Sequence, residues 1–289
     1  MLKSIKKAIL CFGLTIGLIN TLFTEKEMTN FVINEAHTQA IKTIIFDIGD
    51  VLFTSSRTQQ IKSLLILACY HPTLIHTLLT LDVKKELFDM LDKIPAISTM
   101  PIYYQNKPMP LIMTDLMIGR PTTEIISIIE QHLESFHYST NQKRLFQQLI
   151  LFIFQPEKLV EAMQPLKKTM HLAHAFKKHG YNLHILSNWD PKSFALLHQK
   201  YPLFFKIFDE ITISGKEGLA KPDPSIYIQF LSKHNLDPKE CLFIDDEPNN
   251  IKAAGNLGIL GIEHTSLKST CQRLQDLGIL KKVQPSNER

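Results

Sequence analysis

Strands and helices alternate along the second half of the chain, and this alternation restricts the fold more than any other feature. Short apolar runs typical of strands lie at residues 181–186, 210–213, 241–244 and 259–262. Stretches with helical spacing lie at residues 159–179, 191–200, 224–234 and 248–257, and a final helix ends near residue 277. Repeated strand and helix units predict a parallel sheet with right-handed crossovers and helices on both faces. We therefore predict an α/β protein with a Rossmann-like core.

The segment FDIGDVLF, residues 46–53, supplies the first candidate site residue of this core. Thr43, Ile44 and Ile45 form a β-branched run typical of a buried strand. Asp47 follows where this pattern changes into a turn that contains a glycine. Open α/β sheets bind their ligands outside the carboxyl ends of the strands. Asp47 is therefore expected at the ligand-binding edge of the sheet.

Residues 58–155 interrupt the core, because they carry helical spacing without intervening strands. Prolines separate the predicted helices, since proline lacks an amide donor and clashes with the preceding turn. The stretch from Pro95 to Pro110 is predicted to be a long irregular loop that packs against or covers another part of the molecule. We expect an all-helical cap at residues 58–155, inserted after the first strand of a core that comprises residues 41–57 and 156–283.

The first 24 residues form a separate segment. Three lysines precede sixteen uncharged, mostly apolar residues, 8–23, which is the pattern of a secretory signal peptide or a membrane anchor. No clear small-residue cleavage site follows, which favours an anchor, although the run is shorter than the ~20 residues that usually span a bilayer. The positive charge before the run predicts an exported or membrane-anchored body, tethered through residues 8–23. A buried N-terminal helix in a cytoplasmic protein is the alternative.

Composition excludes some functional classes. The formal net charge is +4 and the basic residues form no dense block, so we expect no nucleic-acid partner. The four cysteines form no close-spaced pair, which indicates neither a disulfide framework nor a zinc site.

Three later segments place polar groups at or just after the ends of apolar strands. In a parallel sheet, these groups converge on the edge that carries Asp47. Each one alone has an ordinary explanation as a turn residue or a helix cap. Together, and in this order, they predict one site. These residues are Ser187, Asn188, Lys221, Asp245, Asp246 and Asn250.

The segments FDIGDVLF, LSNWD, AKPDP and FIDDEPNN, in this order, resemble the four motifs of the haloacid dehalogenase-like hydrolase superfamily. The resemblance covers residues 41–55 and 159–269, and residues 58–155 match only the habit of placing a helical cap after the first strand. It implies a Mg²⁺-dependent phosphatase that acts on a small phosphorylated substrate through an aspartyl-phosphate intermediate.

The resemblance also implies roles for individual residues. Asp47 would be the nucleophile, because attack by a carboxylate on phosphorus divides one difficult displacement into two easier ones. Asp47, Asp246 and the backbone carbonyl of Gly49 would bind the Mg²⁺ that neutralises the repulsion between carboxylate and phosphate.

The remaining motif residues would bind the phosphoryl group or orient the metal ligands. Ser187, the backbone amide of Asn188 and Lys221 would hold the phosphoryl oxygens. Asp245 and Asn250 would orient the groups around the metal.

Gly49 stands where phosphatases of this superfamily commonly carry a second aspartate, the general acid for the leaving group. Asp50 is adjacent, but its place in the turn is expected to direct its side chain elsewhere. One alternative is therefore a catalytically weakened binding or regulatory protein. Another is a metal-independent 2-haloacid dehalogenase, which the acidic pair Asp245 and Asp246 disfavours.

Overall fold

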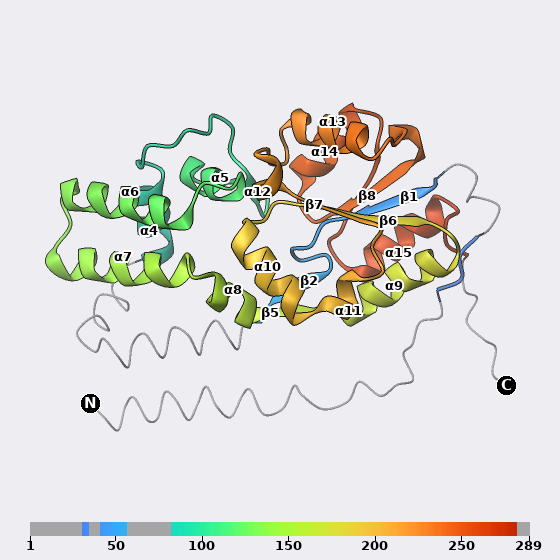
Figure 1. Ribbon diagram of the computed structural model, residues 1–289, viewed down its shortest axis with the longest axis horizontal. Helices are drawn as coiled ribbons and strands as arrows, with labels where there is room; N and C mark the ends of the chain where they lie inside the picture. Colours follow the sequence, from blue (N-terminus) through green and yellow to red (C-terminus); the bar gives the residue numbers. More distant parts are fainter. Residues whose placement is uncertain (1–30, 35–40, 57–81, 282–289) are drawn as a thin grey trace, which may run out of the picture. The chain divides into compact units, whose positions relative to one another are not determined.

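The computed structural model describes residues 31–34, 41–56 and 82–281 (Figure 1). The predicted signal or anchor segment, residues 1–24, lies outside the described residues, as does the part of the predicted cap from residue 58 to residue 81. Within the described ranges, no helix combines the length and the apolar character needed to cross a membrane.

A five-stranded parallel sheet forms the core, with the strand order β7-β6-β1-β8-β9. The strands are β1 (Thr43–Phe46), β6 (Asn182–Ser187), β7 (Glu210–Ile213), β8 (Cys241–Asp245) and β9 (Leu260–Glu263). The central strand β1 is buried throughout and pairs with β6 on one side and β8 on the other. The predicted α/β fold with a Rossmann-like parallel sheet is confirmed.

Helices cover both faces of this sheet. Figure 1 shows α13 (Pro224–Lys233) and α14 (Pro248–Asn256) on one face, and α9 (Lys167–Lys178), α10 (Pro191–Lys200) and α15 (Leu267–Asp276) on the other. Shorter helices are α11 (Pro202–Phe205), α12 (Ser214–Glu217) and a 3₁₀ turn at Pro238–Glu240. The sequence fixes where several of these helices begin. Asp190 caps α10 by accepting from Lys192 N and Ser193 N, and a proline occupies the first helical position.

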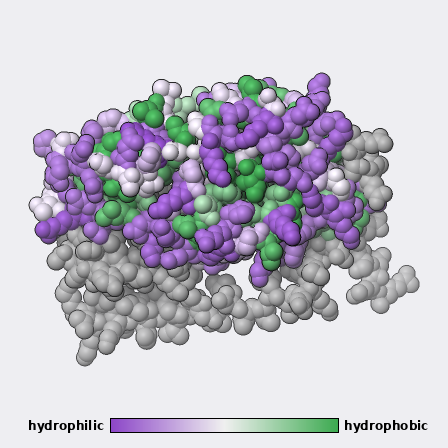
Figure 2. Space-filling model, viewed as in Figure 1, coloured by the Kyte–Doolittle hydropathy of each residue, from purple (hydrophilic) through white to green (hydrophobic). Residues whose placement is uncertain are grey.

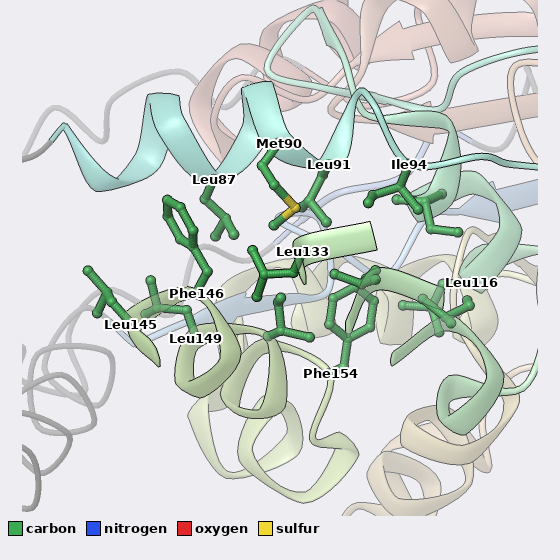
Figure 3. Close-up of a cluster of buried hydrophobic side chains, with 14 residues drawn as sticks. Leu87, Met90, Leu91, Ile94, Leu116, Leu133, Leu145, Phe146, Leu149 and Phe154 are labelled. Atoms are coloured by element: carbon green, nitrogen blue, oxygen red, sulfur yellow. The ribbon is translucent and has the colours of Figure 1, made fainter. Parts of the chain in front are cut away.

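The described part of the insert contains α4 (Val83–Leu91), α5 (Leu111–Met117), α6 (Thr122–Ser135) and α7 (Thr140–Ile153), and α8 (Pro156–Ala162) follows directly after it. Side chains of α4, α6 and α7 point toward one another in a hydrophobic cluster of their own (Figure 3). The insert therefore has its own apolar interior, separate from the layer between the sheet and helices α13 and α14.

Polar residues cover most of the molecular face shown in Figure 2, with apolar residues scattered among them.

A short hairpin adds strands to the insert, where the sequence predicted only helices and an irregular loop. Strands β3 (Tyr103–Tyr104) and β4 (Lys107–Pro108) pair antiparallel. The two residues between them, Gln105 and Asn106, have φ values of 51° and 57°. Two successive positive φ values give the turn whose twist suits a two-residue hairpin loop.

The two segments that connect the core to the insert form a short antiparallel sheet with each other. Strand β2 (Phe53–Ser55) lies antiparallel to β5 (Met163–Pro165). The prediction of one helix over residues 159–179 is wrong, because β5 divides it into α8 and α9. Pro165 explains the break, since it lacks an amide donor and disfavours helical geometry in the residue before it.

Candidate active site

Lys221 connects three strands of the sheet through its ammonium group. Its Nζ lies 2.6 Å from Asp47 Oδ1 and 2.6 Å from Asp245 Oδ2, and it donates to the carbonyl of Leu186 at 2.9 Å. These partners belong to the carboxyl ends of β1, β8 and β6. Lys221 is 1% exposed, so the ion pairs are shielded from solvent. The structure thus brings together three segments that are far apart in the sequence.

The buried charges stabilise one another. Burial by itself would lower the pKa of Lys221, but the charges of Asp245 and Asp47 raise it above the ordinary value. Burial raises the pKa of Asp245 to about 6, against the lowering effect of Lys221. Lys221 and Asp245 each favour the charged form of the other. Two buried opposite charges need such direct contacts, because each would otherwise carry an uncompensated cost of desolvation.

Asn188 holds the loop that carries Lys221. Its side-chain amide donates to Lys221 O at 2.8 Å, and its Oδ1 accepts from Lys221 N at 2.8 Å. The sequence assigned only the backbone amide of Asn188 a role, as a phosphate donor, and gave no signal for this side-chain pairing. Ser187 ends β6 and is buried, but the cavity described below is lined by the next two residues and not by Ser187.

Asp245 also organises the start of α14. Its Oδ1 accepts from Glu247 N at 2.8 Å and from Asn250 Nδ2 at 3.0 Å, and the carboxylate is fully buried. Asn250 Oδ1 is buried without a hydrogen-bond partner among the described residues. Asp245 lies behind Lys221 and Asn250, in a place suited to orienting them.

Asp246 lines the same cavity as Asp47 and Gly49. Burial, followed by the negative charges of Asp47 and Asp245, raises the pKa of Asp246 to about 8. Three carboxyl groups therefore crowd around a single ammonium, and without a further cation this crowding favours the protonated form of Asp246.

This donor set suits a hard divalent cation. Among the described residues, no three His, Cys, Asp or Glu side chains gather as a metal site. The predicted ligands, however, are only two carboxylates and one backbone carbonyl, which are the oxygen donors that Mg²⁺ uses together with water and substrate oxygens. Such an ion would favour the charged forms of Asp47 and Asp246 by offsetting their mutual repulsion.

A cavity of about 210 Å³ opens beside these groups. On the core side it is lined by Asp47, Lys221 and Asp246, with Trp189 and Asn250 beside them. The described part of the insert contributes six further lining residues: Ile102, Tyr103, Tyr104, Met109, Met113 and Met117. The sequence predicted that the loop containing Tyr103 and Met109 covers something, but it did not single out Met113, Met117 or Trp189. The spacing of four between the two methionines was the only available signal, because it places them on one helix face.

Two sets of contacts hold the insert against the core on either side of this cavity. At the hairpin turn, Asn106 N donates to Glu247 Oε2 at 2.9 Å, and Asn249 Nδ2 donates to Asn106 Oδ1 at 2.9 Å. At the end of α5, Ser214 Oγ donates to the carbonyl of Met117 at 2.5 Å. Nearby, a Cβ on Gly119 would lie 2.2 Å from the carbonyl oxygen of Gly215. Only glycine fits there, which shows how closely the two backbones approach.

Comparison with known proteins decides the family. A family model described as haloacid dehalogenase-like hydrolase matches residues 41–258. The chain belongs to the haloacid dehalogenase-like hydrolases. Among curated relatives of this hydrolase, flavin mononucleotide hydrolase 1 of Arabidopsis thaliana is 33% identical over 89 residues, which are 27% of this chain and 36% of the relative. The sesquiterpene phosphatase astK of Aspergillus oryzae is 28% identical over 115 residues, 40% of this chain and 58% of the relative.

The match covers less than two thirds of the length of either relative. Among solved structures, a HAD family enzyme from Bacteroides thetaiotaomicron has a TM-score of 0.53 and 19% identity, with 81% of this chain and 99% of that chain covered. The same enzyme has been solved as a magnesium complex, which matches with a TM-score of 0.51. These structures share the fold of this haloacid dehalogenase-like hydrolase.

In this haloacid dehalogenase-like hydrolase, the surroundings of Gly49 have room for a side chain. A Cβ built on Gly49 meets only Asp47 Oδ2, at 3.6 Å, which is ordinary van der Waals contact. Asp50 is among the residues that line the cavity, and together with Thr54 it also lines a neighbouring one. Its Oδ1 accepts a hydrogen bond from Thr54 Oγ1 at 2.6 Å. Asp50 thus belongs to the site region, although one of its oxygens is already engaged.

Proposed function

We propose that this hydrolase is a Mg²⁺-dependent phosphatase that acts on a small phosphorylated molecule. The observation that carries the proposal is the direct contact of Lys221 with Asp47 in a cavity that Asp246 also lines. A carboxylate beside a fixed cation and a second carboxylate is the arrangement that attack on a phosphate ester requires. Relatives named as a flavin mononucleotide hydrolase and a sesquiterpene phosphatase support the phosphate-ester class.

The proposed reaction has two steps. In the first, an oxygen of Asp47 bonds to phosphorus and the bond between phosphorus and the leaving oxygen breaks, which gives an aspartyl-phosphate and the free alcohol after that oxygen takes up a proton. In the second, water displaces Asp47 from phosphorus and releases inorganic phosphate. The ammonium of Lys221 remains beside the reacting oxygens and stabilises the negative charge that spreads over them.

Mg²⁺ would be held by Asp47, Asp246 and the carbonyl of Gly49, and it would supply positive charge that offsets the repulsion between carboxylate and phosphate. A protein of the same fold has been solved with magnesium, which supports this cofactor. Asp245 and Asn250, which hydrogen-bond to each other, would orient the groups around the ion.

Turnover of p-nitrophenyl phosphate with Mg²⁺ tests the proposal. We expect activity from the wild type, loss of activity with EDTA, recovery with added Mg²⁺, and no activity from Asp47→Asn. Asp92→Asn is the matched control, because Asp92 is exposed at the end of α4 and belongs to the insert. Equal turnover by wild type and Asp47→Asn would refute the proposed role of Asp47.

Gly49 supports a second candidate, a weakened family member that binds a ligand or a partner without turnover. Tight binding of Mg²⁺ and phosphate by a protein that hydrolyses no phosphate ester would favour it. A 2-haloacid dehalogenase would instead release halide without metal. The acidic pair Asp245 and Asp246 at the end of β8 disfavours this alternative.

A further inference from the structure

The active-site cavity has a charged side and an uncharged side. Among the described lining residues, every charged side chain comes from the core: Asp47, Asp50, Lys221, Asp246 and Glu247. The six lining residues from the insert are aliphatic, thioether or phenolic, and the core adds Trp189 next to them. A phosphate ester bound with its phosphoryl group at Lys221 would place the rest of the molecule against this uncharged side.

Several polar atoms on the uncharged side are already engaged, and the phenolic hydroxyls of Tyr103 and Tyr104 are two further polar groups there. The indole N–H of Trp189 donates to Ser193 Oγ at 3.2 Å, and the backbone N–H of Ile102 donates to Thr114 Oγ1 at 3.0 Å. The carbonyl of Met117 accepts from Ser214 Oγ. These groups have little capacity left for a hydroxyl or a charge on the ligand. Burying such a group without a partner is unfavourable.

The methionines give this side an adaptable apolar surface. Met113 and Met117 lie four residues apart on α5, and Met109 precedes that helix by two residues. Methionine is flexible and polarisable, so it fits apolar groups of different shapes and contacts aromatic rings favourably. The contacts at Ser214 and Gly119 fix the end of α5, so this surface stays in place above the site.

We infer that the leaving group of the substrate is an uncharged, apolar alcohol, aromatic or alkyl, bound by Met109, Met113, Met117 and Trp189. This inference rests on the proposed phosphatase function and names its substrate class. Each methylene of the leaving group that enters the apolar side is expected to improve kcat/KM by about fourfold. A sugar, nucleotide or carboxylate at the same place would find few hydrogen-bond partners besides the hydroxyls of Tyr103 and Tyr104.

Binding can be measured without turnover, because Trp189 is the only tryptophan of the chain and lines the cavity. The probes are n-butylphosphonate and 3-hydroxypropylphosphonate. Their chains have the same length, but the first ends in a methyl group and the second in a hydroxyl group. With Mg²⁺ present, quenching of the tryptophan fluorescence should give a dissociation constant at least tenfold lower for the butyl compound. Equal constants, or tighter binding of the hydroxyl compound, would overturn the inference.

Met113→Gln and Met109→Gln test the residues themselves. Each places an amide on the uncharged side, so the ratio of the two dissociation constants should fall toward one. Met100→Gln is the control, because Met100 is exposed and does not line this cavity. Thermal unfolding shows whether a variant folds. If the Met113 variant does not fold, the Met109 variant alone provides the test. A ratio that stays the same in both folded variants would contradict the assignment.

Turnover separates this inference from the proposed function. n-Butyl phosphate and glycerol 3-phosphate are both esters of a primary alcohol, and glycerol is the better leaving group, so a preference for the butyl ester cannot come from the leaving group; kcat/KM should be at least tenfold higher for the butyl ester. If both esters are hydrolysed equally, the phosphatase proposal stands and the substrate class is wrong. If neither is hydrolysed, the fluorescence titration alone decides the preference for apolar ligands, and the phosphatase proposal fails only if p-nitrophenyl phosphate is not hydrolysed either.

Discussion

Gly49→Asp is the most informative substitution, because it adds the carboxyl group that the site lacks. The backbone accepts a side chain, since φ at Gly49 lies outside the left-handed region and its Cβ position meets only Asp47 Oδ2 at 3.6 Å. The new carboxyl group would lie beside the proposed nucleophile. A general acid placed there would protonate the leaving oxygen as the bond to phosphorus breaks.

The expected gain follows from the usual contribution of a positioned acid. Such a group raises the rate by roughly 10² to 10⁴, which corresponds to about 3 to 5 kcal/mol of activation free energy. The gain should be largest for an alkyl phosphate, whose alkoxide is a poor leaving group, and small for p-nitrophenyl phosphate. A side cost is also expected, since two carboxylates roughly 5 Å apart repel by up to about 3 kcal/mol at an effective dielectric constant of 20. The variant should therefore unfold at a lower temperature without Mg²⁺ and recover when Mg²⁺ is added.

Steady-state kinetics with n-butyl phosphate and p-nitrophenyl phosphate measures this gain in wild type, Gly49→Asp and Gly49→Asn. The asparagine variant has nearly the same shape but cannot donate a carboxyl proton. An equal gain in the aspartate and asparagine variants, or an equal gain on both substrates, would refute the acid mechanism. No gain in a folded, Mg²⁺-stabilised variant would show that a missing acid does not limit this protein.

Three further substitutions test the packing and the buried charges. Lys221→Met should lower the free energy of unfolding in urea by about 3 to 5 kcal/mol, because it leaves two buried carboxylates without their cation; an unchanged value would contradict this account. Gly119→Ala should lower stability by at least about 1 kcal/mol and weaken the docking of the insert, since φ is 96° and the Cβ would meet the backbone of Gly215. Burial lowers the pKa of His184 to about 4, so the unfolded chain binds a proton more readily below the ordinary value of 6.5. Stability should therefore fall by up to about 3 kcal/mol as the pH drops from 6.5 to 4, and His184→Phe should remove most of that fall in denaturation curves measured at each pH.

The sequence predicts the parts of the site that follow directly from strands. Asp47 and Asp246 could be placed because each comes just after an apolar run, and parallel strands bring such positions to one edge. Lys221 could be placed only through its motif, because its loop is held by the side chain of Asn188, 33 residues earlier. Strand β5 could not be predicted from its apolar pattern, since its pairing partner β2 lies more than 100 residues away. Local periodicity contains no information about such distant partners.

The uncharged side of the cavity shows the same limit. The spacing of Met113 and Met117 identifies one face of α5 but does not say whether that face meets the insert interior or the active site. The contact between Asn106 and Glu247 joins residues 141 positions apart. Only the folded chain shows which surfaces these long-range contacts bring together.

The contacts that hold the insert are made by direct neighbours of the site residues. Glu247 binds the hairpin turn of the insert, and Asp246, the residue before it, faces the cavity. Ser214 donates to the insert at Met117 and accepts from the backbone N–H of Trp189, which lines the cavity. A shift of the insert would therefore move the backbone next to a proposed metal ligand and next to the apolar surface at once. In this arrangement the proposed surface for the leaving group and the proposed phosphoryl site share the same contacts between core and insert, so a substitution that disturbs these contacts should impair both.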